Sequence, residues 1–349
     1  MTSDRMRTLI YPLEQEILSF PPEARVLFLG AEPGIAQSGS FGTQNIICVQ
    51  GFRPSFLALE REGRTVLPEP SGDDYDVALV LCGRHRGQNE AWVGEALKRT
   101  RQGGTIVIGG AKTDGVASLR KRLSQSLVID GHASKHHGLV FWLRRGSGSN
   151  GYIDDISQEN QSTVTEPNEA EPKTPMIFQT APGMFSHEHV DPASRLLAEC
   201  LPADLKGAAA DFCAGWGYLS VALAQRAPAI KTVDLFEADH ASLQAARRNL
   251  AALAPGVGAR FFWQDLVGEP VADRYDVIVM NPPFHAGRAA EPSLGDALIA
   301  AASRAMKPRG RMFLVANRQL PYETALAKGF SRVEKLREEM GFKLFCAYR

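Results

Sequence analysis

The chain has 349 residues, 44% of them hydrophobic and 22% charged, and its formal net charge is zero. This length predicts two domains. The polar first residues do not resemble a signal peptide, and no run of about 18 apolar residues predicts a membrane-spanning helix. The five cysteines and eight histidines show no disulfide or metal-ligand spacing, so we expect a cytoplasmic protein with reduced thiols and no metal site.

Residues 1–145 predict a first α/β domain in which short apolar runs alternate with helical segments. Expected strands cover residues 26–29, 46–49, 76–81, 104–109 and 139–143, and expected helices cover residues 91–99 and 116–127. The turn at residues 30–34 lacks a close Gly-x-Gly, and no Asn-Pro-Pro follows the strand at 76–81. We therefore interpret this half as a degenerate copy of the second half, which binds or supports rather than reacts.

Charge is distributed unevenly along the chain. Residues 98–145 hold ten basic and two acidic side chains, a surplus that either contacts a phosphate backbone or forms an ordinary solvated helix face. Residues 146–175 hold six acidic residues, one basic residue and almost no large apolar side chain. Such a composition predicts a flexible acidic linker that contains the domain boundary.

Residues 176–349 predict the second domain. A strand-like piece at 178–180 precedes a helix that begins at Asp191-Pro192, and a strand at 208–212 leads through Gly215 and Gly217 into another helix. Glycines let a backbone approach a ligand closely, and a helix start offers free N–H groups. Further expected helices cover residues 241–253, 291–306 and 322–328, and further strands cover 232–237, 260–265, 276–280, 310–317 and 342–348, the last one antiparallel.

Two acids end successive strands after the glycine turn. Glu237 lies about 20 residues beyond the glycines, where a carboxylate can accept ribose hydroxyls, and Asp265 follows the next strand. A helix N-cap for Glu237 and a turn acid for Asp265 are the structural alternatives. A glycine turn followed by these two acids at successive strand ends favours a nucleoside-type ligand.

The apolar strand at 277–280 stops at Asn281-Pro282-Pro283-Phe284. The Asn281 side-chain oxygen and the Pro282 carbonyl can each accept one N–H of a conjugated amine, while Phe284 stacks on its ring. Two fixed acceptors aim the nitrogen lone pair at an electrophile. A plain turn that closes the strand is the structural alternative.

These motifs resemble the class I S-adenosylmethionine-dependent methyltransferases, and more narrowly the ribosomal RNA guanine-N2 methyltransferases of the small-subunit methyltransferase C family. The resemblance rests on residues 180–186 with Asp191, on residues 281–287, and on residues 315–317 with 320–322. Cys213 stands where family members usually have glycine. The resemblance implies two tandem Rossmann-like methyltransferase domains, a degenerate one and a catalytic one with a mostly parallel seven-stranded sheet and helices on both faces.

The resemblance also implies roles for individual residues. S-adenosyl-L-methionine would bind Asp211, Ala214, Gly215, Gly217, Glu237, Ala238, Asp265 and Asn281. The catalytic group would be Asn281, Pro282 and Phe284, and the base would lie against Pro283, Phe284 and His285. The implied activity is methylation of guanine N2 in ribosomal RNA, most simply 16S, as free RNA or in a ribosomal subunit, by a protein for which we favour a monomer.

Two alternatives stay open at this point. The same Asn-Pro-Pro-Phe arrangement serves any conjugated NH2, so a protein glutamine or adenine N6 is a possible substrate. A non-catalytic RNA-binding assembly factor could also have inherited the fold without binding the cofactor.

Overall fold

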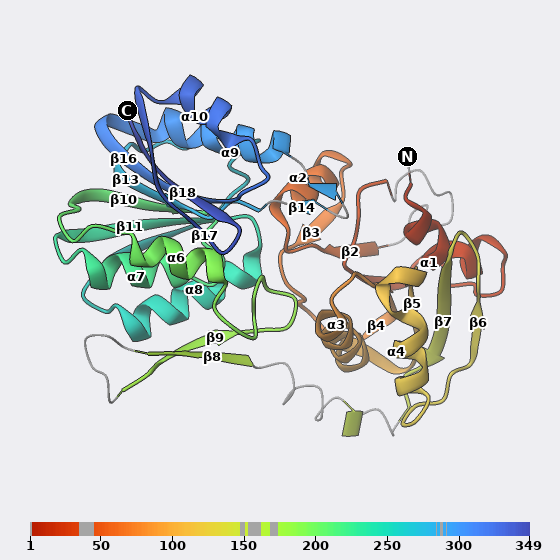
Figure 1. The fold of residues 1–349 in the computed structure, drawn as a ribbon. Helices are drawn as coiled ribbons and strands as arrows, with labels where there is room; N and C mark the ends of the chain where they lie inside the picture. Colours follow the sequence, from red (N-terminus) through yellow and green to blue (C-terminus); the bar gives the residue numbers. More distant parts are fainter. Residues whose placement is uncertain are drawn as a thin grey trace. The chain divides into compact units, whose positions relative to one another are not determined.

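The computed structural model describes residues 2–34, 45–146, 151–152, 162–167, 174–283, 285–286, 289–290 and 292–349. The chain forms two compact units: Met1–Ser162 with Ala181–Gly183, and Thr163–Thr180 with Met184–Arg349. Figure 1 shows the elements of both units in chain order. None of the described helices is long and apolar enough to cross a membrane.

The first unit is built on one seven-stranded sheet, in the order β3-β2-β1-β4-β5-β7-β6. Neighbouring strands are parallel except at the β5–β7 and β7–β6 pairs, which are antiparallel. The strands are β1 (Arg25–Leu29), β2 (Asn45–Val49), β3 (Thr65–Leu67), β4 (Tyr75–Leu81), β5 (Thr100–Ala111), β6 (Gly131–Ala133) and β7 (Gly138–Arg144). The α-helices are α1 (Asp4–Glu14), α2 (Arg53–Arg61), α3 (Arg86–Arg99) and α4 (Val116–Leu123).

The second unit repeats this strand order as β12-β11-β10-β13-β16-β18-β17. Its strands are β10 (Gly207–Phe212), β11 (Ile230–Glu237), β12 (Gly258–Trp263), β13 (Tyr275–Met280), β16 (Met306–Asn317), β17 (Arg332–Glu339) and β18 (Phe342–Tyr348). Its helices are α6 (Pro192–Glu199), α7 (Tyr218–Arg226), α8 (His240–Leu253), α9 (Pro292–Ala305) and α10 (Tyr322–Gly329). Figure 1 shows α6, α7 and α8 on one side of the sheet and α9 and α10 on the other. The prediction of two tandem α/β domains with mostly parallel sheets is confirmed.

Several elements differ from the sequence-based predictions. The antiparallel last strand, β18, is confirmed, but its edge partner β17 was not predicted. Its sequence, Arg332 to Glu339, is mostly charged and exposed, which is typical of an edge strand and hides the period-two pattern. Helices α1 and α2 and the short strands β3 and β6 were also missed, and β12 ends at Trp263, two residues before the predicted end.

Part of the predicted linker is ordered. Residues Ser162–Glu166 form strand β8, which pairs with β9 (Met176–Thr180) in a two-stranded sheet, so the expectation of a flexible linker is wrong for this part. Val164 is buried, and the buried Glu166 side chain forms an ion pair with Arg195 of α6. These two side chains, which composition cannot reveal, hold the strand against the second unit.

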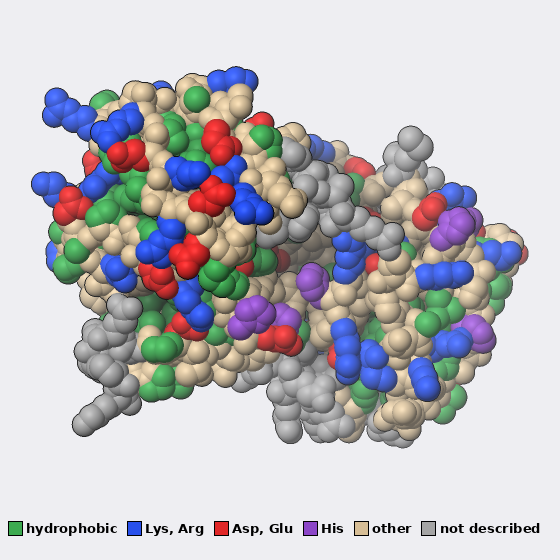
Figure 2. Space-filling view, in the orientation of Figure 1, with side chains coloured by type: hydrophobic (Ala, Val, Ile, Leu, Met, Phe, Trp, Pro, Cys, Tyr) green, Lys and Arg blue, Asp and Glu red, His purple; other side chains and the backbone are tan. Residues whose placement is uncertain are grey.

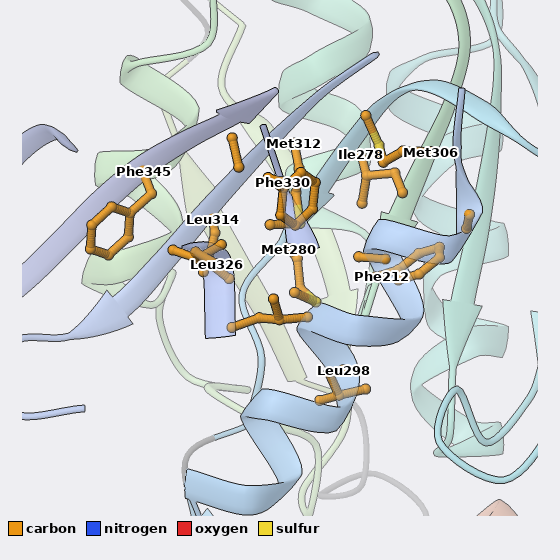
Figure 3. Close-up of a cluster of buried hydrophobic side chains, with 14 of the residues drawn as sticks. Phe212, Ile278, Met280, Leu298, Met306, Met312, Leu314, Leu326, Phe330 and Phe345 are labelled. Atoms are coloured by element: carbon orange, nitrogen blue, oxygen red, sulfur yellow. The ribbon is translucent and has the colours of Figure 1, made fainter. Parts of the chain in front are cut away.

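The core of the second unit determines which side chains of β13 face the site. Ile278 and Met280 point into an apolar cluster that also contains Leu298 of α9 and Leu326 of α10 (Figure 3). Because successive side chains of a strand point to opposite faces, the residue after Met280 turns toward the side that α6 covers. Asn281 is therefore directed away from the core and toward the start of α6.

Candidate active site

The strand order changes direction between β10 and β13, which are parallel neighbours. In an open α/β sheet, the crevice at the carboxyl ends of two such strands is where ligands bind. Phe212 pairs with Met280 in the register of these strands. The glycine turn after β10 and Asn281 after β13 therefore leave the sheet side by side.

The glycine turn contains three residues with left-handed backbones: Cys213 at φ 63°, Gly215 at φ 53° and Gly217 at φ 89°. A Cβ atom on Gly217 would lie 2.9 Å from Leu250 Cδ1 of α8, whereas a Cβ on Gly215 would meet nothing within 4 Å. Gly217 is thus required by the packing of the loop on α8. Gly215 borders open space, as a residue at a ligand site does.

Several backbone N–H groups of the turn are already bonded. The N–H groups of Ala214 and Gly217 donate to the carbonyls of Phe236 and Ala214, and that of Gly215 donates to the Glu237 carboxylate. All three residues precede Tyr218, the first residue of α7, so their bonds do not test the expectation that the helix start offers free N–H groups. These bonds fix the shape of the loop.

Asn249 of α8 is a structural residue of the site that the sequence did not reveal. Its side-chain NH2 donates to the carbonyls of Trp216 (2.8 Å) and Gln179 (3.0 Å), and its oxygen accepts from the Gln179 N–H at 2.7 Å. It ties the glycine turn to β9. Trp216 adds a second tie, because its buried indole N–H donates to the Phe185 carbonyl at 2.9 Å.

Asp211, the last residue but one of β10, is fully buried. One carboxylate oxygen accepts from the Ser220 hydroxyl at 2.7 Å, and the other, Oδ1, has no hydrogen-bond partner in the described part of the chain. Burial raises the pKa of Asp211 to about 7. A buried carboxylate with one unsatisfied oxygen is costly alone and is stabilised by a cationic ligand.

Glu237 ends β11 next to the glycine turn. Its two oxygens accept from the N–H groups of Gly215 (2.8 Å) and Asp239 (2.9 Å). The N-cap of α8 is Asp239, whose carboxylate accepts from the Ser242 N–H, so the structural alternative of Glu237 as that cap is wrong. Burial raises the pKa of Glu237 to about 7. The adjacent residue Ala238 accepts a bond from the Trp263 indole through its carbonyl.

Asp265 lies two residues beyond the end of β12. Its Oδ1 accepts from the Val267 N–H at 3.0 Å, and its own N–H donates to Glu269 at 2.9 Å. The side chain therefore closes its own turn, as the structural alternative predicted. This bond uses one of its two carboxylate oxygens.

Asn281 is held by the start of α6. Its side-chain NH2 donates to Asp191 Oδ2 at 2.9 Å and to the Ser194 hydroxyl at 2.8 Å. Neither contact could be foreseen from the sequence, where the residues lie 90 and 87 positions apart. Asp191-Pro192 predicted the helix start but gave no signal for its contact with the strand end.

A cavity of about 40 Å³ lies between the glycine turn, the start of α6 and Asn281, and Asp211, Glu237 and Asp265 do not line it. Its lining includes Asn281, Asp191, Ser194 and, from the glycine turn, Cys213, Ala214 and Gly215. A larger cavity of about 640 Å³ lies between the β8–β9 sheet, α6 and α7. That cavity contains none of the predicted cofactor or catalytic residues, so we assign the site to the smaller one.

The rest of the predicted substrate tip is described only in part. Pro282 is buried and Pro283 is exposed. Phe284 lies outside the described residues, and His285 is described only as the backbone of strand β14 (His285–Ala286), which pairs with β15 (Ala289–Ala290). Their predicted roles remain predictions.

The residues present fit S-adenosylmethionine. Its methionine part carries an ammonium group, which suits the unsatisfied buried oxygen of Asp211. Its ribose has two hydroxyls, which suit the half-buried carboxylate of Glu237, and Gly215 leaves space where a side chain would stand. Among the described residues, no cluster of His, Cys, Asp or Glu could hold a metal ion.

Comparison with known proteins agrees with this geometry. Residues 175–346 match the methyltransferase small domain family. The chain is 26% identical over 272 residues to ribosomal RNA small subunit methyltransferase C of Vibrio vulnificus (strain CMCP6), covering 78% of this chain and 77% of that protein. It is 35% identical over 172 residues to the protein of the same name from Escherichia coli (strain K12), covering 49% of each.

A solved structure shares the whole fold. The T. thermophilus 16S rRNA N2 G1207 methyltransferase, in complex with AdoMet and guanosine, matches with a TM-score of 0.80 at 24% identity, over 98% of this chain and 91% of that one. The chain is therefore a class I S-adenosylmethionine-dependent methyltransferase that resembles ribosomal RNA small subunit methyltransferase C, with residues 175–346 in the methyltransferase small domain family.

Proposed function

We propose that this protein methylates the exocyclic N2 of a guanine in ribosomal RNA, most simply 16S, and that Asn281 and Pro282 hold the amine. The observation that carries the proposal is the orientation of Asn281. Its NH2 is bonded to Asp191 and Ser194, and no described residue donates to its Oδ1. That oxygen is available to accept an N–H from a substrate at the cavity beside the glycine turn.

Methyl transfer requires little from the protein beyond orienting the substrate amine toward the methyl group. When bound, S-adenosylmethionine supplies a methyl group on a positively charged sulfur. Asn281 Oδ1 and the Pro282 carbonyl accept the two N–H bonds of the amine, which localises the nitrogen lone pair and directs it at that methyl carbon. The lone pair forms the new N–C bond as the S–C bond breaks and sulfur keeps the electron pair. The methylated nitrogen then releases one proton to solvent.

Asp211 and Glu237 would hold the cofactor in this reaction, with Gly215 and Gly217 shaping the turn beneath it and Ala214 and Ala238 beside it. Asp265 would reach the adenine with the carboxylate oxygen that does not close its own turn. Phe284 would stack on the guanine, between Pro283 and His285. All these positions lie at or just beyond the carboxyl ends of β10, β11, β12 and β13.

We favour guanine over other conjugated amines because of what the similar proteins act on or bind. Both curated relatives are ribosomal RNA small subunit methyltransferases, and the matched structure contains guanosine. A base inside folded RNA must be extruded from its stack before the amine can reach the site. The target nucleotide must therefore be held by contacts outside the catalytic crevice.

We assign the phosphate contacts to the first unit. Figure 2 shows Lys and Arg side chains spread over its visible face. Several of the basic side chains in residues 98–145 make no ion pair with any described residue, namely Lys98, Lys112, Arg120, Lys121 and Arg144, whereas Arg99, Arg101 and Arg122 are paired with acids. Unpaired cations on one domain suit a phosphate backbone.

The function is tested with radiolabelled cofactor. Purified protein is incubated with small ribosomal subunits, large subunits, protein-free rRNA, and peptide-chain release factors as carriers of a glutamine amide. Digestion of the labelled RNA to nucleosides should yield N2-methylguanosine from the small-subunit rRNA. Label in N6-methyladenosine or in protein would reject the proposed substrate, and no label anywhere would favour a non-catalytic assembly factor.

A further inference from the structure

The side-chain amide of Asn281 can adopt only one orientation in this site. One of the two acceptors of its NH2 is Asp191 Oδ2, at 2.9 Å. An ionised carboxylate accepts hydrogen bonds and donates none, so it must face the nitrogen of the amide and not the oxygen. A flipped amide would place its oxygen against Asp191 Oδ2 and lose that bond, whereas the Ser194 hydroxyl can donate to an amide oxygen as well as accept from an amide NH2.

The two residues that impose this orientation are themselves held in place. Asp191 is the N-cap of α6, and the same Oδ2 accepts from the Ser194 N–H at 2.8 Å. Ser194 is buried in the first turn of the helix, where its hydroxyl lies 2.8 Å from Asn281 Nδ2. The helix start thus presents two prearranged acceptors, one charged and one neutral, to the end of β13.

We infer that Asp191 and Ser194 are positioning residues for methyl transfer: they turn the NH2 of Asn281 away from the substrate and present its Oδ1 to the substrate amine. The inference rests on the proposed function, because it concerns the acceptor role of Asn281. Without these two acceptors the amide can rotate. For part of the time its NH2 then faces the substrate amine. Both groups are hydrogen-bond donors, so no hydrogen bond forms between them.

Two substitutions separate this role from the cap of α6. Asp191→Ser keeps a strong N-cap residue, because serine caps helices about as well as aspartate, but withdraws the carboxylate from Asn281. Ser194→Ala removes the hydroxyl and leaves the backbone N–H that residue 191 caps. Asp191→Asn is the conservative control, since its amide oxygen can accept both bonds that Oδ2 accepts.

The kinetic test compares Asp191→Ser/Ser194→Ala in two backgrounds. In the otherwise native protein, kcat on the RNA substrate should fall by about tenfold or more, as expected when a reacting group is misaligned. The cofactor Kd and the KM for RNA should stay within about threefold. With Asn281→Ala already present, the same pair should change kcat by less than about twofold, because residues that act through one group are non-additive. Asp191→Asn alone should retain most activity.

An equal fall of kcat in both backgrounds would show that Asp191 and Ser194 support the fold independently of Asn281. Unchanged kcat in the native background would show that the orientation of the Asn281 amide does not matter. Either result overturns the inference. The same holds if Asp191→Asn is as impaired as the double variant.

A second measurement needs no activity, so it decides the inference even if rRNA guanine is not the substrate. The ¹⁵N side-chain amide signal of Asn281, identified by its loss in Asn281→Ala, should show slow hydrogen exchange in the native protein. In Asp191→Ser/Ser194→Ala it should exchange as fast as an exposed asparagine. Fast exchange in the native protein, or slow exchange in the double variant, contradicts the positioning role, while absence of rRNA methylation contradicts only the proposed function.

Discussion

Gln50 and Glu237 bridge corresponding loops of the two units, but only one of their two hydrogen bonds runs in the same direction. Gln50 follows β2 and its Oε1 accepts from the N–H two residues on, at 2.9 Å, while its Nε2 donates to the Ala31 carbonyl in the turn after β1. Glu237 ends β11 and accepts from Asp239, also two residues on, and from Gly215 in the turn after β10. The first unit thus keeps the loop architecture but replaces the carboxylate by a neutral amide.

The turn after β1 is also filled. Gly30 has φ 71°, and a Cβ there would lie 2.4 Å from Trp92 Cζ3 of α3 and 2.8 Å from the Leu81 carbonyl. Gly30 and Cys213 are each the first residue after their strand, β1 and β10, so the Trp92 indole packs against the start of the turn in the first unit. These contacts give a physical reason for the degenerate character that the sequence predicts for the first unit.

One cofactor should bind per chain. Calorimetric titration with S-adenosylhomocysteine is expected to give a stoichiometry of one, and Glu237→Ala should weaken that binding strongly, whereas Gln50→Ala should leave its affinity unchanged. A stoichiometry of two, or a loss of affinity in Gln50→Ala equal to that in Glu237→Ala, would show that the first unit also binds the nucleoside.

The two glycines of the turn should respond differently to alanine. Gly217→Ala adds a Cβ against Leu250 at a left-handed backbone, so we expect a loss of about 2–4 kcal/mol in the free energy of unfolding by urea. Gly215→Ala meets no neighbour and should cost only about 1 kcal/mol. Gly215→Ala should nevertheless lower cofactor affinity about tenfold or more, because its methyl group enters the ligand space. Unaltered affinity in that variant would place the cofactor elsewhere.

Cofactor affinity should increase with pH. Burial raises the pKa values of Asp211 and Glu237 to about 7, so below that pH both are largely protonated in the free protein. A cationic ligand favours the ionised carboxylates, and binding at low pH therefore releases protons. Affinity at pH 7.0 should exceed that at pH 5.5 by about tenfold or more, and Asp211→Asn should flatten the dependence. A cofactor affinity that does not change, or that falls, between pH 5.5 and 7.0 contradicts the assignment of Asp211 and Glu237 as cofactor-binding residues.

The same shifts predict the pH dependence of stability without cofactor. The carboxyls of Asp211 and Glu237 stay protonated in the folded state up to about pH 7, whereas in the unfolded chain they ionise near pH 4. The folded state then binds more protons, so the free energy of unfolding should fall as pH rises from about 4 to 7. Asp211→Asn should weaken this trend in urea titrations, and a trend as steep as in the native protein would contradict the contribution of Asp211.

Much of the second unit was predictable because its signals are local. The apolar run of β13 and the prolines after it mark a buried strand and its end. Two of the three left-handed positions after β10 are the glycines Gly215 and Gly217, whereas the third is Cys213. The contacts that orient the site are not local. Asp191 and Ser194 contact Asn281 only because the sheet alternation turns Asn281 toward α6. Strand β8 pairs with β9 and is held by the buried Val164 and by the ion pair of Glu166 with Arg195.

Turnover and cofactor binding of Asn281→Ala, measured side by side, test the central claim most directly. If Asn281 accepts an N–H of the guanine amine, single-turnover methylation of small-subunit rRNA should slow by about 10²-fold or more, while the Kd for S-adenosylhomocysteine stays within about threefold of the native value. Native turnover in this variant, or a loss of cofactor binding as large as the loss of turnover, would contradict the account.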